Sequence, residues 1–393
     1  MLNTHTRIFV ATLFLMMISV VFVFSTGFFN YGGQKSPYEF LYHQFLFSLV
    51  GISIICAMQF MSKKTCYNLM IVMFLVALIA CAILPLLPTS LVVETKGARR
   101  WIRVFGFSLA PLEFLKIGAI YLLALTYSRR IYAGEKSVVK ECVILLPTVL
   151  IYIILFWLIY STQNDLGQCV LIAMVLIFMA FRAGVSYKLF FSLILASVLA
   201  IILIILISPR RLQRILDWWG GAQDFFLLLF PENIQEILRV SNSEMPYQIF
   251  HSINAIYNGG FVGRGFGLGV FKLGFLSEVH TDFILAGIAE EIGFLGFIGV
   301  GVIFVILILS IFRLAVLMKN KKDHLFCYGI GICLMISFFM NLGGIISFIP
   351  LKGIAVPFLS YGGSSMIANS IGIGAILCIF KNAGENKELD IKI

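Results

Sequence analysis

Long runs of apolar residues alternate with short polar connections along most of this chain. Ten of these runs have about the 20 residues that a helix needs to cross the hydrocarbon core of a membrane. We therefore predict an all-α polytopic membrane protein with about ten transmembrane helices in a single domain, residues 1–393. The predicted helices lie near residues 8–29, 41–61, 68–88, 111–128, 142–161, 165–182, 187–208, 283–312, 324–346 and 364–380.

The composition agrees with this pattern. Hydrophobic residues make up 60% of the 393 residues and charged residues only 12%. The mean hydropathy is +1.01, whereas a water-soluble domain of this size would need far more polar surface. The first apolar run has no small-residue cleavage site, so we expect a retained helix rather than a signal peptide.

The distribution of Lys and Arg predicts the orientation of the chain. An even number of spans puts both ends on one side, and positive charges collect in cytoplasmic segments. Most Lys and Arg residues of the short segments lie on the side of the termini, so we expect both termini to be cytoplasmic, with residues 382–393 as a short tail. This topology accounts for the net charge of +10 without a nucleic-acid partner.

The outer connection before the fourth span carries a cationic cluster. Its sequence, KGARRWIRVFGFSLAPLEFLK, places Lys96, Arg99, Arg100 and Arg103 around Trp101. Such residues fit an anchor in the lipid headgroups, and they equally fit an outward-facing anion site, because the Arg donor fork matches phosphate.

The next two charged residues belong to the start of the fourth span. Pro111 suits the first turn of a helix, and Glu113 and Lys116 follow three residues apart. This spacing predicts a salt bridge at the mouth of the helix.

The connection between the seventh and eighth spans, residues 209–282, is too long for a turn. It opens with Arg210, Arg211 and Arg214, and it later contains the glycine-rich bend NGGFVGRGFGLG around Arg264. Glycines permit tight turns and a close approach of backbone to a ligand, although a flexible loop has the same composition. Aromatic residues throughout the connection favour packing on the outer membrane face, with a short helix near 248–257. We predict that it acts as a lid.

Acidic residues occupy the start of the eighth span, in LSEVHTDFILAGIAEEIGF. Carboxylates are costly in hydrocarbon and are usually functional there. Asp282 is at the edge of the span, and Glu290 and Glu291 are two to three turns deeper. On a regular helix these two lie about 80° and about 180° from Asp282, so we predict structural or proton-handling roles for them.

The last outer loop is SFIPLKGIAVPFLSYGGSS, residues 347–365. Two prolines stiffen it, and Gly353, Gly362 and Gly363 let the chain fold back. Irregular backbone at membrane depth lines a cavity or is buried in protein. The loop is therefore predicted to belong to a site or to serve as a structural cap.

Several classes of site are missing from the sequence. The eight cysteines show no Cys-x-x-Cys spacing, so neither a zinc site nor a disulfide scaffold is predicted. The chain also has no Walker A motif, no dinucleotide fingerprint and no serine elbow. Any work that it does relies on no ATP site of its own.

A set of motifs resembles the SEDS family (shape, elongation, division and sporulation proteins), whose members include FtsW and RodA. The motifs follow one another over nearly the whole chain: KGARRWI, PLEFLK, QNDLG, YQIFHSINAIYNGG, HTDFI with EEIGF, and PLKGIAVPFLSYGGSS. Residues 98–101 and Lys352 are closer to the division branch, FtsW, than to the elongation branch, RodA. The chain departs from the family pattern at Leu112, Asn164, Ser277 and Ser347. None of these departures removes a charged residue of the motifs.

The resemblance implies a peptidoglycan glycosyltransferase, which joins the sugars of lipid II into glycan strands at the outer face of the inner membrane. It assigns the essential acid to Asp282, which would remove a proton from the acceptor hydroxyl in an inverting displacement. The leaving pyrophosphate needs positive charge rather than an acid. The candidate substrate-binding residues are Arg99, Arg100, Lys116, Arg210, Arg211, Arg264, Lys352, Ser360, Gly362 and Gly363, with Glu113 as a structural partner.

Two other functions remain open, a lipid II flippase and a scaffold for a partner synthase. Charge concentrated in the outer loops favours chemistry outside, and a scaffold would have little need for an acid beside a cationic cluster. The family implies a class B penicillin-binding protein (a transpeptidase), other division proteins and membrane lipids as partners, at the division septum or, for a RodA-type role, in elongation. No cofactor is identified. A divalent cation, Mg²⁺ or Mn²⁺, is compatible with the pyrophosphate, and no residues are assigned to a metal.

Overall fold

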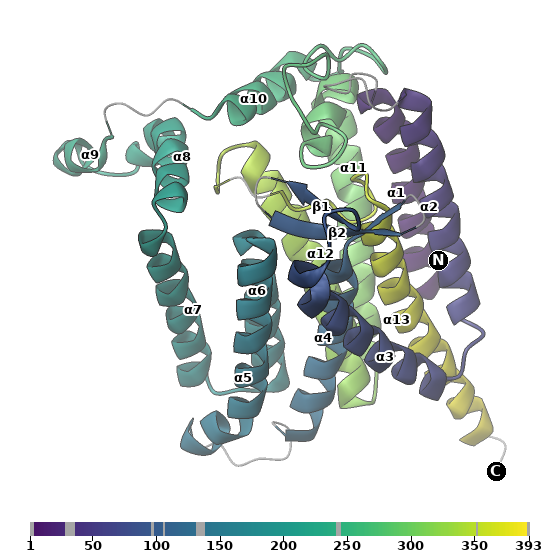
Figure 1. Ribbon diagram of the computed structural model, residues 1–393. Helices are drawn as coiled ribbons and strands as arrows, with labels where there is room; N and C mark the ends of the chain where they lie inside the picture. Colours follow the sequence, from purple (N-terminus) through teal and green to yellow (C-terminus); the bar gives the residue numbers. More distant parts are fainter. Residues whose placement is uncertain are drawn as a thin grey trace.

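The computed structural model describes residues 4–27, 36–95, 98–104, 107–130, 138–240, 245–350 and 353–390. It is a bundle of long helices (Figure 1). A long helix occupies each of the ten predicted ranges: α1 (Thr4–Thr26), α2 (Pro37–Met58), α3 (Lys63–Ile83), α4 (Pro111–Arg130), α5 (Val138–Gln163), α6 (Leu166–Ala183), α7 (Tyr187–Ile207), α11 (Ile284–Leu317), α12 (Lys321–Ile345) and α13 (Gly363–Asp390). A 3₁₀ turn, η1 (Leu84–Leu86), extends α3.

Within the described ranges, 8 helices are long and apolar enough to cross a membrane. The chain is therefore an all-α polytopic membrane protein, as predicted. The number of spans, their orientation and the single-domain organisation stay predictions.

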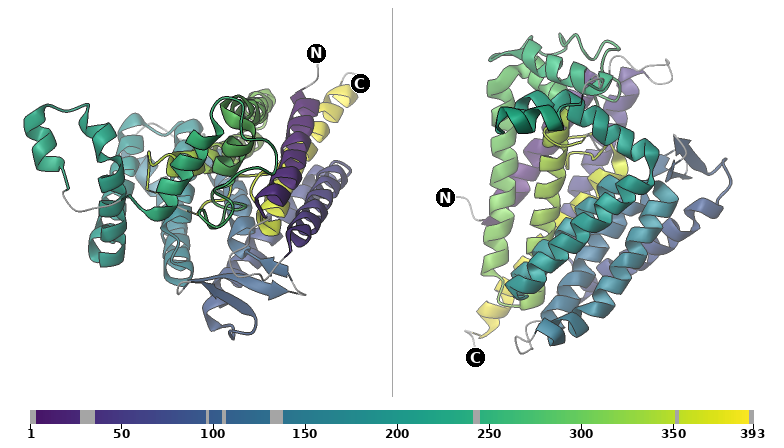
Figure 2. Two further views of the ribbon diagram at one scale, coloured as in Figure 1. Left: turned by 90° about the horizontal axis from the view of Figure 1, so that it is seen from above. Right: turned by 90° about the vertical axis from the view of Figure 1, so that its left-hand side faces the viewer.

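The helices differ in how much of their surface the protein covers. α12 packs against α4, α6 and α11, and 72% of its most apolar window is buried. No residue of the corresponding window of α7 is buried, and α7 is the most apolar of these helices. Figure 2 shows α5, α6 and α7 inclined together at one side of the bundle. The centre of the bundle is thus α12, and α7 presents its apolar surface to the membrane.

The connection before α4 forms a small sheet that the sequence-based prediction missed. Strands β1 (Val92–Thr95), β2 (Ala98–Val104) and β3 (Phe107–Leu109) are antiparallel in the order β1-β2-β3, and Ile102 pairs with Val92 on one side and Leu109 on the other. The sequence ARRWIRV has no strict alternation of polar and apolar residues, because Arg99 and Arg100 are adjacent and Trp101 and Ile102 follow as a pair. The prediction therefore treated the charges as a loop cluster.

The long connection between α7 and α11 is mostly helical and has two parts. Helices α8 (Pro209–Leu227) and α9 (Glu232–Leu238) form what we call the α8–α9 hairpin, residues 209–240, which reaches out to one side of the molecule (Figures 1 and 2). The second part, which we call the anchored segment, is residues 245–283. It contains α10 (Tyr247–Gly259) and confirms the predicted short helix.

The eighth predicted span is broken near its N-terminal end. At Gly293 the backbone of α11 has φ 68° and ψ −174°, which separates a short helix from a longer one. The glycine-rich bend fills the break, because Phe294 N donates to Gly260 O at 2.8 Å and Gly265 N donates to Glu291 O at 2.9 Å. A Cβ at Gly263 would lie 2.3 Å from Glu291 O. Glycine is thus required where these two backbones meet.

Candidate functional site

Asp282 lies in the turns just before α11, not on the helix. Its backbone N donates to Glu278 O at 3.1 Å, and Glu278 has a φ of 58°. The Asp282 side chain is half-buried. A Cβ placed on Gly353 would be 2.6 Å from Asp282 Oδ2, so the carboxylate lies directly against the backbone of the last outer loop. Lys352, the candidate cation next to it, is outside the described residues.

Hydrogen bonds join the loop that carries Asp282 to the last outer loop. Ser360 Oγ donates to Thr281 O at 2.7 Å and accepts from Val356 N at 2.8 Å. Tyr361 N donates to His280 O at 2.8 Å. Ser360 is buried, so its hydroxyl holds the loops together rather than facing a substrate.

The glycines after Ser360 bring this turn to the start of α4. A Cβ at Gly363 would lie 2.4 Å from the ring of Phe47, whereas Gly362 meets only Ser365, at 3.9 Å. Ser364 Oγ accepts from Ala110 N at 2.8 Å. The turn therefore contacts the residue just before α4, the helix that carries the Glu113–Lys116 pair.

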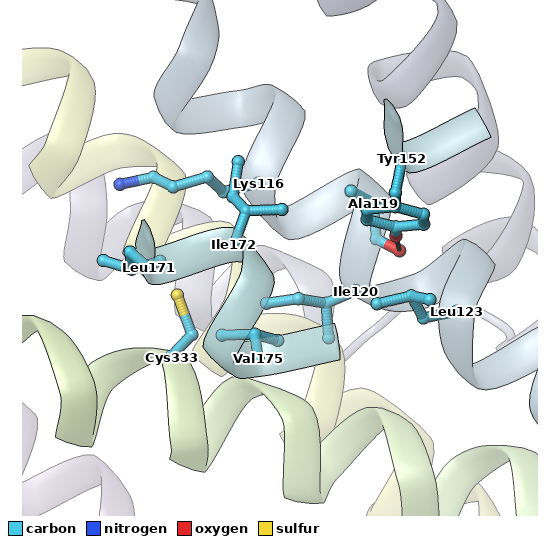
Figure 3. Close-up of a pocket in the computed structure, with 9 residues that line it drawn as sticks. All are labelled: Lys116, Ala119, Ile120, Leu123, Tyr152, Leu171, Ile172, Val175 and Cys333. Atoms are coloured by element: carbon cyan, nitrogen blue, oxygen red, sulfur yellow. Dashed lines mark hydrogen bonds between the residues drawn. The ribbon is translucent and has the colours of Figure 1, made fainter. Parts of the chain in front are cut away.

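The predicted salt bridge on α4 is confirmed. Lys116 Nζ lies 2.9 Å from one oxygen of Glu113 and 3.0 Å from the other, and Lys116 is buried. A small cavity next to Lys116 lies between α4, α5, α6 and α12 (Figure 3). The volume within which the centre of a water molecule can move is about 10 Å³. This volume suffices for about one water, so the cavity cannot hold a lipid-linked sugar. Its lining residues are Lys116, Ala119, Ile120, Leu123, Tyr152, Leu171, Ile172, Val175 and Cys333.

The cationic cluster on β2 is engaged with the protein itself. Arg99 Nη1 donates to Pro85 O at 2.9 Å. Arg100 Nε donates to Gln163 O at 3.1 Å, and its Nη2 lies 3.5 Å from Asp165 Oδ2. These contacts tie the sheet to α3 and to the turn between α5 and α6. The structure thus gives both arginines structural partners that the prediction of an open anion site did not include.

The remaining candidate arginines also differ from one another. Arg210 is exposed in the first turn of α8. Arg211 donates to Tyr160 and Asn164, and its guanidinium lies 4.4 Å from the centroid of the Tyr160 ring. Arg264 Nε donates to the backbone O and side-chain Oδ1 of Asn258, both at 2.9 Å. Of these three side chains, Arg211 and Arg264 are held by contacts within the protein, whereas Arg210 is exposed.

Glu290 and Glu291 have firm partners, which the sequence did not reveal. Glu290 Oε1 accepts from Asn258 Nδ2 at 2.8 Å and from Val270 N at 2.7 Å. Glu291 Oε1 lies 2.7 Å from Lys272 Nζ, and both side chains are buried. The predicted angles to Asp282 do not apply, because Asp282 precedes the helix. Both acids hold the anchored segment on α11. Their predicted structural or proton-handling role stays a prediction.

Aromatic rings cover one side of the Asp282 loop. The ring centroids of His280 and Phe40 are 4.7 Å apart, and those of Phe40 and Tyr361 are 5.1 Å apart. Burial, followed by the nearby Glu39, raises the pKa of the Tyr361 phenol. The phenol therefore stays neutral and can donate a hydrogen bond at physiological pH.

Two polar residues inside this region escaped the sequence analysis. They are Lys272, the partner of Glu291, and Asn341, a buried amide in α12. A lone polar residue in an apolar helix is itself a signal, and it singles out Asn341. The described residues contain no group of three His, Cys, Asp or Glu side chains placed to hold a metal. No residue is therefore assigned to a cation.

Comparison with known proteins agrees with the motifs. The FtsW/RodA/SpoVE family, described as "Cell cycle protein", matches residues 5–385. A protein of Helicobacter pylori strain J99, named "Probable peptidoglycan glycosyltransferase FtsW", is 39% identical over 388 residues, 96% of this chain and 98% of its own. One of Taylorella equigenitalis with the same name is 31% identical and covers 92% of this chain and 94% of its own.

Solved structures share the fold. A chain from "Structural coordination of polymerization and crosslinking by a peptidoglycan synthase complex" aligns with a TM-score of 0.70 at 21% identity, covering 94% of this chain and 97% of that one. The rod shape determining protein RodA of Thermus thermophilus aligns with a TM-score of 0.64 at 22% identity, covering 95% and 96%. Since the family match spans nearly all of the chain, this protein belongs to the FtsW/RodA/SpoVE family of cell-cycle proteins.

Proposed function

We propose that this protein is a peptidoglycan glycosyltransferase of the FtsW type, which polymerises lipid II at the outer face of the inner membrane during septal cell-wall synthesis. The observation that carries the proposal is the placement of Asp282. Its half-buried carboxylate faces the backbone of the last outer loop, at the outer end of a membrane-embedded helix. Hydrogen bonds hold that loop to the loop that carries Asp282. A lipid-linked sugar would lie at this depth.

Asp282 acts as the general base in this proposal. The 4-hydroxyl of the acceptor sugar attacks the anomeric carbon of the donor, the carboxylate takes its proton, and the bond from that carbon to the pyrophosphate oxygen breaks. One displacement with one base inverts the configuration. The leaving pyrophosphate carries its own negative charge and needs cations rather than an acid.

Two cations are candidates for this chemistry: Lys352, which precedes Gly353 in the sequence, and Lys116. Lys116 is neutralised by Glu113, so Lys352 is the stronger candidate for the pyrophosphate. Arg100 would act on the site indirectly, because it anchors the sheet to the turn between α5 and α6. A divalent cation, Mg²⁺ or Mn²⁺, would arrive bound to the pyrophosphate.

The proposed partner is a class B penicillin-binding protein, which would cross-link the new strands, together with other division proteins. The name of the structural neighbour, a peptidoglycan synthase complex, supports this assembly. The α8–α9 hairpin is its proposed contact, because Leu228, Leu229 and Ile237 are 79%, 77% and 81% exposed.

The test is polymerisation of purified, labelled lipid II in detergent by the parent protein and by Asp282→Ala, with glycan strands resolved on a gel. We expect strands from the parent alone. A folded Asp282→Ala protein that polymerises at the parent rate refutes the base assignment. A parent that moves lipid II across vesicle membranes and forms no glycan refutes the proposed reaction.

A further inference from the structure

Asp282 and the last outer loop meet at a place where neither backbone is helical. Glu278 and Phe358 both have a positive φ, of 58° and 63°. Such backbone leaves carbonyl groups without the internal partners that a helix provides, and at membrane depth these must be satisfied by protein. The identity of the groups that satisfy them therefore determines how the two loops are held.

One side chain satisfies a carbonyl from each loop. Asn341 Nδ2 donates to Asp282 O at 2.7 Å and to Ile354 O at 2.9 Å. Asn341 is 1% exposed and lies near the outer end of α12, the helix that the rest of the bundle covers most extensively. Its two N–H groups thus fasten Asp282 and the residue after Gly353 to one rigid helix.

The consequence reaches the carboxylate. Gly353 lies so close to Asp282 that an added Cβ would be 2.6 Å from Oδ2, so the loop backbone limits where the carboxylate can point. We propose that Asn341 is a positioning residue, which fixes the Asp282 carboxylate relative to the Lys352–Gly353 loop for proton transfer. The inference rests on the proposed function and adds a residue to it.

The experiment compares Asn341→Leu, which keeps the size and removes both donors, with Asn341→Asp. The acid form of Asp keeps one donor, and burial against two carbonyls favours that form. We expect kcat of Asn341→Leu on lipid II to fall about 100-fold, as for a misplacement of about 1 Å, with KM nearly unchanged. The kcat of Asn341→Asp should lie between that of the parent and that of Asn341→Leu. It should also fall as the pH rises, and the pH profile of the parent should lack this fall.

Ser337→Ala is the matched control. Ser337 is buried one turn earlier on α12, and its hydroxyl contacts Cys333 of the same helix, donating to the carbonyl O at 2.8 Å. The kcat of Ser337→Ala should therefore equal that of the parent. A folded Asn341→Leu protein with the parent kcat overturns the inference. If that variant does not fold, an Asn341→Asp protein with the parent pH profile overturns it instead. A parent without polymerase activity contradicts the proposed function, whereas equal activity of parent and variant contradicts only this inference.

Discussion

The anchored segment and the α8–α9 hairpin are neighbours in sequence and differ in how the bundle holds them. The anchored segment is bonded to α11 and α12 by buried groups, including Lys272 with Glu291 and Ser252 Oγ with Ile345 O at 3.0 Å. The hairpin meets the bundle through contacts that are partly exposed. They include Trp218 Nε1, which donates to Ser347 O at 2.9 Å, and Arg211, which donates to Tyr160 and Asn164. One half of the connection is therefore rigid enough to place a base, and the other is available to a partner.

Internal bonds help the hairpin to keep its shape with few buried residues. Gln223 bonds both backbone groups of Val240, at 2.9 Å to N and 3.2 Å to O, and Trp219 Nε1 donates to Leu238 O at 2.8 Å. No residue of α9 is buried. A segment that is ordered by its own contacts can move as a unit when a partner binds, and such coupling requires preferential binding to one arrangement.

The largest difference between the two regions should appear on loss of a carboxylate. Asp282→Asn should lower polymerisation by about 10²–10⁴-fold, which is the usual contribution of a general base. Asp217→Asn in the hairpin should not change the rate, because Asp217 only accepts from Gln213 on the same helix. Rates with purified lipid II measure both, and similar losses would show that Asp282 has no special role.

Ion pairs give the next largest contrast. Lys272→Met leaves Glu291 buried without its cation and should lower the free energy of unfolding by about 3–5 kcal/mol. Arg239→Met in the hairpin breaks a pair whose side chains are 56% and 83% exposed, and the cost should be about 0–1 kcal/mol. Denaturation in detergent micelles measures both costs. A Lys272→Met protein as stable as the parent would mean that the anchored segment does not depend on this pair.

Glycine substitutions sharpen the comparison within the anchored segment itself. Gly267 has a φ of 81° and open space around it, so Gly267→Ala should cost only the left-handed strain of about 1–2 kcal/mol. Gly263→Ala adds a clash with Glu291 O and should cost about 1–3 kcal/mol more. The same unfolding measurement tests this, and equal costs would show that the bend yields without loss.

The smallest effect is expected at the apolar tip of the hairpin. Leu229→Ser and Ile237→Ser should change the free energy of unfolding by less than about 0.5 kcal/mol and leave the basal rate intact. Each should weaken binding of the transpeptidase by about 1.5 kcal/mol, or roughly tenfold in Kd. Titration of the purified partner measures this. Unchanged affinity in both variants would place the contact elsewhere on the protein.

The sequence by itself showed that this protein lies in a membrane, where its helices are, and to which family it belongs. Runs of about 20 apolar residues have few structural alternatives, since a membrane requires every backbone group to be bonded internally. The Glu113–Lys116 bridge was also predictable, because i and i+3 side chains on a helix always face each other. Asp282 came from a motif, and its neighbours could not be derived from the same source.

Only the tertiary structure decided which groups face one another. It assigned Arg100 to Asp165, Lys272 to Glu291 and Asn341 to the backbone of Asp282. It also revealed the break in α11 at Gly293, and it showed that the cationic connection before α4 is a sheet rather than a loop. The three side-chain contacts join residues that are 65, 19 and 59 positions apart along the chain. Hydrophobic periodicity specifies the face of an element and carries no information about its partner, which depends on how the helices pack.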